Sequence, residues 1–259
     1  MDHLSEGKAG VCAIAIMAKA PRAGQSKTRL CPPLSPDQAA ALSAAFLRDM
    51  TGKIATAAEA APITGFVAHA RSGTEHLFEG MLAPGTDFIL ADGETGIDGL
   101  VPPGVIGLGR CLFQAAQLML AKGFGAVCLL NSDSPTLPSA VLARAASALL
   151  APGERVVLGP AEDGGYYLIG MKSAHARLFA NIAWSTDTVA GATRVRAMGL
   201  GLEIVELPVW YDVDEHATLD RLIAEIGEHR SPRYHEAPAT EAALRQMGLL
   251  AVNRARAAG

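Results

Sequence analysis

The sequence lacks a surplus of positive charge and a long apolar run, and each absence excludes a class of protein. Its 22 Lys and Arg residues are outnumbered by 26 Asp and Glu residues, which gives a formal net charge of −4. This balance disfavours a general nucleic-acid binder, because phosphate backbones need a basic face. No segment approaches the roughly 18 apolar residues of a membrane helix, and the first ten residues contain no secretory hydrophobic segment. We therefore expect a cytoplasmic protein without a membrane span.

Cysteine is also scarce, and no cysteine stands in a pairing motif. The four residues, Cys12, Cys31, Cys111 and Cys128, form no C-x-x-C pair and have no histidine at zinc-finger spacing. Cys12 and Cys128 lie inside apolar runs, where a thiol usually behaves as a small hydrophobe. We predict reduced cysteines, as is typical of a reducing compartment.

What the chain does have is a repeated alternation of strand-like and helix-like segments. The apolar runs Val11–Met17 and Ala126–Leu130 are typical of strands covered on both faces. The stretch Ser35–Gln38 predicts a helix start, because it supplies an N-cap, a proline at the first position and a capping-box partner. Strand and helix in alternation predict a largely parallel sheet with helices on both faces. The ligand site of such a sheet lies beyond the carboxyl ends of its strands.

The same patterns predict the remaining elements. Further strands are expected at 63–70, 88–91, 155–158, 166–171 and 203–207, and helices at 35–59, 73–82, 108–122, 138–150, 185–198 and 216–226. The stretch 92–107, with five glycines and two prolines, predicts a loop. We expect one domain over 11–227, followed over 228–259 by a linker and a C-terminal helix, itself expected at 239–257. That helix packs on the domain or on a partner, a homodimer being one such arrangement.

A loop after the first strand concentrates positive charge in an otherwise acidic chain. Arg grips phosphate with two donors and Lys supplies a point charge, while Gly24 lets the backbone turn closely around a ligand. A basic loop is often only a solvated turn, but its position after a buried strand favours phosphate binding. It is not a P-loop, because the glycines of that motif would fall at Pro21 and Ser26. The basic residues concerned are Lys19, Arg22, Lys27 and Arg29.

Acidic residues follow other strands. Asp133 comes just after the run Ala126–Leu130, and an aspartate at a strand tip can hold a divalent cation, which prefers oxygen ligands. Such a metal bridges diphosphate oxygens, although Asp133 could instead cap the following turn or helix. Asp212 and Asp214 alternate in an extended segment and so face the same way. They are a second candidate source of metal ligands, the competing interpretation being helix N-capping by Asp214.

The stretch Gly159–Tyr167 reads GPAEDGGYY and places two carboxylates beside two glycines. Gly164 and Gly165 allow a ligand to approach the backbone closely. Asp163, with its neighbour Glu162, could accept hydrogen bonds from sugar hydroxyls or act as a base. Asp-Gly is also the commonest hairpin signal, and the two interpretations are compatible.

Five motifs occur here in the order typical of one bacterial family: MAKAPRAGQSKTRL, SDSPTLP, GPAEDGGYYLIG, WST and YDVD. Over roughly Ile14 to Leu222 the chain resembles this GT-A-like glycosyltransferase family, long classed as a domain of unknown function. Some of its members are named arsenosugar-biosynthesis glycosyltransferases. More distantly, the K-S/T-R-L loop and the DGG turn are similar to those of 2-phospholactate guanylyltransferase and the molybdenum-cofactor nucleotidyltransferases.

The resemblance implies a fold and a cofactor. The fold is GT-A (nucleotide-diphospho-sugar transferase), a Rossmann-like three-layer sandwich with a mostly parallel mixed sheet, and the cofactor is Mg²⁺ or Mn²⁺. By position, Asp133 resembles the metal-binding aspartate, and Asp212 or Asp214 completes the metal shell. Lys27 and Arg29 resemble the phosphate contacts.

The resemblance also implies where chemistry takes place. Asp163 with the Gly164-Gly165 pair would line the donor or acceptor pocket, so Asp163 and Asp133 are the candidate catalytic residues. One departure concerns the Gly-Asp-Leu-Gly-x-Arg stretch of other members, where this chain has Gly107 and Cys111 at the Asp and Arg positions. The preceding loop, 92–105, departs as well.

These inferences lead to one leading hypothesis and two alternatives. The first is metal-dependent glycosyl transfer from a nucleotide sugar to a small-molecule acceptor. The second is nucleotidyl transfer from an NTP to a phosphorylated small molecule, with release of pyrophosphate. The third, motivated by the departures over 92–111, is a degenerate nucleotide-binding protein.

Overall fold

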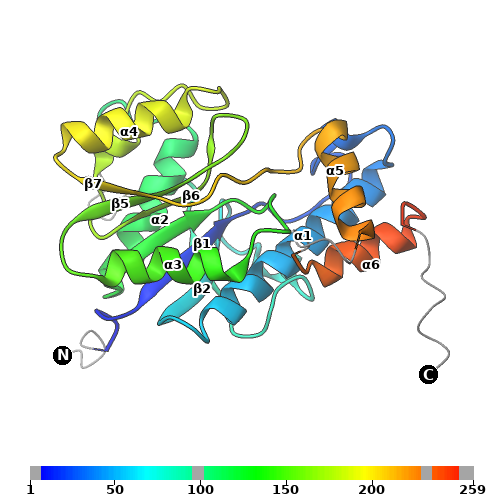
Figure 1. Ribbon diagram of the computed structural model, residues 1–259, viewed down its shortest axis with the longest axis horizontal. Coiled ribbons are helices and arrows are strands. Elements are labelled where there is room, and N and C mark those ends of the chain that lie inside the picture. Colours follow the sequence, from blue (N-terminus) through cyan, green and yellow to red (C-terminus); the bar gives the residue numbers. More distant parts are fainter. Residues whose placement is uncertain (1–6, 95–101, 229–234, 251–259) are drawn as a thin grey trace.

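The computed structural model describes residues 7–94, 102–228 and 235–250, and its centre is a seven-stranded sheet in the order β3-β2-β1-β4-β6-β5-β7 (Figure 1). Strand β6 is antiparallel to its neighbours β4 and β5, and the other neighbouring strands are parallel. The predicted mostly parallel mixed sheet is therefore confirmed. The strands are β1 (Cys12–Met17), β2 (Ile63–His69), β3 (Asp87–Leu90), β4 (Ala126–Leu130), β5 (Arg155–Pro160), β6 (Tyr166–Met171) and β7 (Glu203–Glu206).

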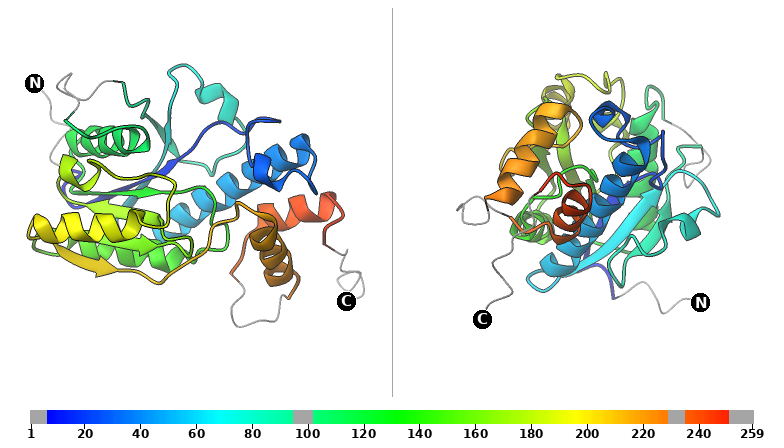
Figure 2. Two further views of the ribbon diagram at one scale, coloured as in Figure 1. Left: turned by 90° about the horizontal axis from the view of Figure 1, so that it is seen from above. Right: turned by 90° about the vertical axis from the view of Figure 1, so that its right-hand side faces the viewer.

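Helices cover both faces of the sheet, which makes three layers (Figures 1 and 2). On one face α1 and α3 bury apolar side chains against β1 and β4, and on the other face α2 and α4 do so. No helix among the described residues is long and apolar enough to cross a membrane. The helices are α1 (Pro36–Ala57), α2 (Leu108–Ala121), α3 (Ser139–Leu150), α4 (Val189–Gly199), α5 (His216–Gly227) and α6 (Pro238–Gln246), with short 3-10 helices η1 (Thr28–Leu30), η2 (Glu75–Phe78) and η3 (Ala176–Leu178).

A third apolar cluster lies beyond the sheet, where α5 and α6 pack beside the N-terminal half of α1 (Figure 2). Leu42 and Phe46 of α1 meet Leu222 of α5 and Leu244 of α6 in this cluster. The start of α1 has the predicted capping box, with Ser35 as the N-cap and Pro36 at the first position. This end of the molecule holds the segments that build the site.

Three predicted helices differ from the structure. Helix α4 begins at Val189, not at Ser185, because Ser185 has a left-handed φ of 64° and Thr186 Oγ1 bonds locally to Ala183 O at 2.7 Å. Helix α6 ends at Gln246, since Gly248 turns the chain at a φ of 74°.

Residues 251–257, which the prediction placed in the same helix as α6, lie outside the described residues. The segment predicted as a helix over 73–82 contains only the single 3-10 turn η2. The predicted loop at 92–107 includes residues 95–101, which also lie outside the described part.

Candidate active site

A polar cavity of about 670 Å³ opens at the ends of β1 and β4. Its walls come from the basic loop after β1, from α1, from the turn after β4, from the β5–β6 hairpin and from the segments before α4 and α5. The volume falls in the range of ordinary small-molecule sites, roughly 300–1,000 Å³. The charged residues of the wall are Lys19, Lys27, Arg29, Asp133, Asp163, Asp187 and Asp214.

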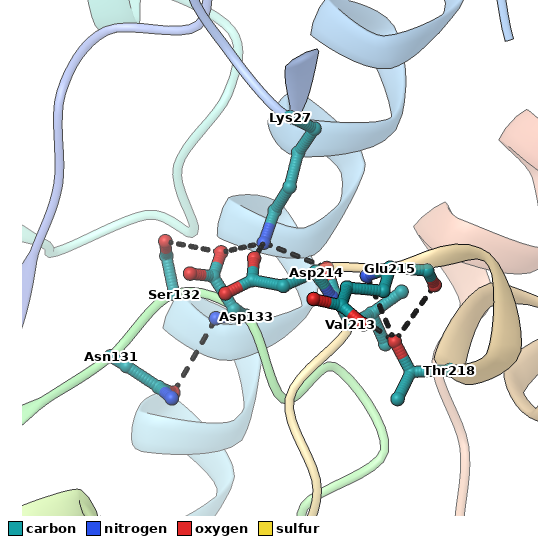
Figure 3. Close-up of polar contacts among 8 residues, drawn as sticks. All are labelled: Lys27, Asn131, Ser132, Asp133, Val213, Asp214, Glu215 and Thr218. Atoms are coloured by element: carbon teal, nitrogen blue, oxygen red, sulfur yellow. Dashed lines mark hydrogen bonds and ion pairs between the residues drawn. The ribbon is translucent and has the colours of Figure 1, made fainter. Parts of the chain in front are cut away.

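The ammonium group of Lys27 lies at the centre of the polar contacts in this cavity (Figure 3). Its Nζ is 2.7 Å from Asp133 Oδ1 and 2.6 Å from Asp214 Oδ1. It also donates to the carbonyl oxygen of Val213 at 2.9 Å. Burial by itself lowers the pKa of Lys27, but the Asp133 and Asp214 carboxylates outweigh it, so the net pKa is raised. Lys27 is therefore a fixed positive charge.

The segment before α5 is positioned by backbone bonds to two other strand ends. Trp210 N donates to Pro160 O at 3.1 Å, and Val213 N donates to Asp133 O at 2.8 Å. Tyr211 and Val213 are buried, which leaves the alternate residues Asp212 and Asp214 on the other side, as an extended segment requires. This alternation was predicted.

Asp214 does not cap α5, so that interpretation was wrong. The N-cap is Glu215, whose backbone N–H donates to the Thr218 hydroxyl at 3.2 Å. Asp133 does not cap α3 either, because the N-cap of that helix is Pro138, without a side-chain bond. Both carboxylates are thus available to the cavity.

Asp212 lies in a strongly acidic neighbourhood. Burial, followed by the charges of Asp163, Asp214 and Asp133, raises the pKa of Asp212 to about 6. Its carboxylate therefore interacts electrostatically with the other three aspartates, although Asp212 does not line the cavity wall. Excess negative charge is a property of the whole site.

The β5–β6 turn carries Asp163 to the cavity wall. Asp163 Oδ1 accepts the N–H of Gly165 at 2.8 Å, which fixes the carboxylate. Gly164 has a φ of +88°, and a Cβ added there would lie 2.1 Å from Asp187 O. Only glycine allows this approach, so the hairpin packs directly on the segment before α4. The DGG sequence thus forms a hairpin, and its Asp163 lines the cavity.

The other predicted residues divide between two cavities. Lys19 and Arg29 line the main one, whereas Arg22 lines a smaller neighbour of about 180 Å³ that shares Lys19 with it. Gly24 adopts a φ of +72° in the basic loop and, like Gly164 and Gly165, lies outside the wall of the main cavity.

Several wall residues were not predicted as site residues. Ser43 of α1 is a lone serine in an Ala-rich helix, which carries no signal of a site, and Ser132 has only its place beside Asp133 to suggest a role. The stretch 184–187 has two interpretations from its sequence, a substrate contact or a Trp anchor followed by a helix cap, and its residues Ser185–Asp187 line the cavity.

The two carboxylates on Lys27 fit a cation. Oxygens of Asp133 and Asp214 converge on a single point, and carboxylate oxygens are the ligands that Mg²⁺ and Mn²⁺ prefer. Within the described residues, no group of three or more metal-ligating side chains gathers in one place. The convergence involves two side chains, and the cation at their meeting point is the ammonium of Lys27.

The divergent stretch Gly107–Cys111 forms the start of α2. Gly109 permits close packing, because a Cβ there would lie 2.9 Å from the Trp184 ring. Burial and then Asp92 raise the pKa of the Cys111 thiol, which Lys19 opposes. The position that is Arg in the family that the motifs resemble is thus held by Cys111, within electrostatic reach of Lys19.

The fold and the cavity together define a GT-A-like, Rossmann-type α/β protein, in agreement with the resemblance of the motifs. Residues 99–186 match the family model described as "Uncharacterized protein conserved in bacteria (DUF2064)". No curated protein matches the sequence significantly.

The chain is also similar to solved structures. A candidate nucleotide-diphospho-sugar transferase from Desulfovibrio desulfuricans G20 is 28% identical, with a TM-score of 0.75, over 92% of this chain and 95% of that chain. The CMP:2-keto-3-deoxy-manno-octonic acid synthetase complexed with CTP is 13% identical, with a TM-score of 0.48, over 85% and 98%. Glucosyl-3-phosphoglycerate synthase from Mycobacterium tuberculosis, with Mn²⁺ and UDP, is 13% identical, with a TM-score of 0.47, over 82% and 74%.

Proposed function

We propose that this protein is a metal-dependent transferase that takes a nucleotide sugar as donor. The observation that carries the proposal is the convergence of Asp133 and Asp214 on one cation, in a cavity that also presents basic side chains. A diphosphate needs both features, because its charge must be balanced by cations while its oxygens are positioned. The similarity to the candidate nucleotide-diphospho-sugar transferase supports the same class.

The charge of the cavity wall supports a role for a metal. Lys19, Lys27 and Arg29 face four carboxylates, those of Asp133, Asp163, Asp187 and Asp214. A diphosphate entering this cavity would meet net repulsion from the wall. An added divalent cation reverses that balance, and Lys19 and Arg29 then supply direct phosphate contacts.

Asp133 and Asp214 are the residues that would hold Mg²⁺ or Mn²⁺. When bound, the ion stabilises the negative charge of the leaving diphosphate. Asp163, fixed by Gly165 N–H at 2.8 Å, is the group that would accept the proton of an acceptor hydroxyl. Ser43 and Ser132 supply neutral hydroxyls to the same cavity.

A binding titration tests the proposal. UDP, GDP and CDP, with their sugars, are titrated by calorimetry with and without Mn²⁺, and we expect at least one of them to bind more tightly with the metal. Asp133→Asn should weaken that binding by about tenfold or more, since one charge-assisted ligand is lost. Asp220→Asn, on the exposed side of α5, is the matched control. If no nucleotide binds under either condition, the proposal is wrong.

Product analysis distinguishes glycosyl from nucleotidyl transfer. The two reactions use the same contacts to a diphosphate, but they leave different products. Release of free nucleoside diphosphate from a nucleotide sugar supports the proposed reaction. Release of pyrophosphate from an NTP would instead identify a nucleotidyltransferase, and tight binding without turnover would identify a binding protein.

A further inference from the structure

Lys27 is built into the acidic site and does not reach into it from the surface. Its side chain is 7% exposed, and Asp133, Asp214 and Val213 O match the three protons of an ammonium group. A phosphate could be contacted by Lys27 only at the expense of one of these partners.

The backbone around Lys27 keeps the ammonium in place. Lys27 has a left-handed conformation, with φ 49° and ψ 39°, at the start of η1. The turn before it is closed by the Ser26 N–H to Arg22 O and by the Arg22 N–H to Ser26 Oγ, both at 3.0 Å. Leu30, at the end of η1, is fully buried. The loop therefore anchors Lys27 on both sides.

The same geometry makes Lys27 a competitor of the divalent cation. A metal ion that used both Asp133 and Asp214 would take the point where Nζ of Lys27 now lies (Figure 3). Two positive charges cannot share that point, because they repel each other and Oδ1 of each carboxylate is already engaged by Lys27. A metal ion that takes these two oxygens must therefore displace the ammonium group.

We propose that Lys27 is an internal counter-ion that locks the metal site until a nucleotide arrives. The divalent cation enters as Lys27 leaves Asp133 and Asp214, and a diphosphate provides the anionic partner that receives the displaced ammonium. Metal and nucleotide then bind together, and metal alone binds weakly. The proposal rests on the proposed function only for the identity of the anion that receives Lys27.

A variant test measures Mn²⁺ binding in the absence of nucleotide by the loss of the free-ion EPR signal. Lys27→Gln should bind Mn²⁺ about tenfold or more tightly than the wild type, because it frees two carboxylates from a cation. Lys122→Gln is the control: it removes an exposed positive charge at the end of α2, outside the cavity wall, and its effect should be less than about threefold, because solvent screens it. Equal affinities of Lys27→Gln and the wild type would overturn the proposal.

A second test uses the wild-type chain and does not depend on the folding of a variant. Reductive methylation of lysines is followed by peptide mass spectrometry, with and without Mn²⁺ at matched ionic strength. Methylation of Lys27 should be slow without metal and at low Mn²⁺, and faster only at Mn²⁺ concentrations high enough to fill the weak metal-only site, while exposed Lys122 reacts equally in all three conditions. If Lys27 stays protected from methylation while Mn²⁺ occupies the site, metal binding does not displace the ammonium group and the proposal is wrong. This test uses no nucleotide, so a failure of the nucleotide titration would contradict the proposed function without changing the outcome for Lys27.

Discussion

At the scale of single residues, Gly164 shows how one position couples two walls of the cavity. Its φ of +88° and the 2.1 Å gap between an added Cβ and Asp187 O leave no room for a side chain. We expect Gly164→Ala to lower the free energy of unfolding by about 1–3 kcal/mol, because the turn must move or strain. Urea denaturation followed by circular dichroism measures this.

Gly191 provides the control for Gly164. It lies inside α4 with nothing within 4 Å of an added Cβ. Gly191→Ala should therefore stabilise the protein by up to about 1 kcal/mol, as expected inside a helix. Similar losses for the two variants would show that the contact with Asp187 is not what restricts Gly164.

The thiol of Cys111 gives a pH dependence at the same scale. Burial, followed by the charge of Asp92, raises the pKa of Cys111 above its ordinary value of 9.0. A smaller fraction of it is thiolate at pH 8 than in an unfolded peptide, and the thiolate is the reactive form. Alkylation by iodoacetamide should be slower than in a Cys111 peptide at pH 8 and should still be rising above pH 9. A rate that levels off below pH 9 would contradict the raised pKa.

At the scale of elements, Asp49 joins α1 to α6. Its carboxylate, only 5% exposed, accepts the N–H groups of Ala239 at 2.9 Å and Thr240 at 2.8 Å in the first turn of α6. Asp49→Ala should cost about 1–3 kcal/mol of unfolding free energy, because two backbone donors lose their acceptor. Thermal and urea unfolding test this, with Asp220→Ala, at an exposed position, as the control. Equal stabilities of the two variants would show that the hydrogen bonds to Asp49 do not stabilise the fold.

The capping box of α1 permits a smaller and cleaner measurement. Ser35 Oγ accepts the Gln38 N–H at 3.2 Å, and Gln38 Oε1 accepts the Ser35 N–H at 2.8 Å. Ser35→Ala should destabilise the protein by about 1 kcal/mol. Ser139→Ala is the control, because Ser139 begins α3 without acting as its cap. If Ser139→Ala lowers the free energy of unfolding as much as Ser35→Ala does, the effect does not come from capping.

At the scale of the whole molecule, the cluster formed by α1, α5 and α6 is distinct from the two clusters that cover the sheet. Leu244→Ala removes a fully buried side chain from it and should cost about 2–5 kcal/mol. We expect hydrogen exchange to accelerate over α6, while β4 keeps its protection. Leu130→Ala, in the sheet core, should instead lower protection throughout, and uniform loss in both variants would show a single cooperative unit.

Local signals in the sequence were sufficient for most of the elements. Ser35, Pro36 and Gln38 predicted the start of α1 because capping depends on residues a few positions apart. The apolar runs at β1 and β4 predicted central strands because both faces of those strands are buried. The start of α4 was predicted too early, because the segment before it packs on the β5–β6 hairpin, where Gly164 lies against Asp187, and a helix-period pattern does not contain such a contact.

The sequence by itself determined which chemical groups stand at the strand ends: a basic loop after β1, Asp133 after β4, a DGG turn after β5 and paired aspartates before α5. Only the tertiary structure decided their partners. Lys27 and Asp214 are far apart in the chain, yet their side chains meet at 2.6 Å, because the sheet order brings these segments to the same edge. A pattern of neighbouring residues carries no information about contacts between distant segments. The pairing of Lys27 with both carboxylates was therefore not predicted from the sequence.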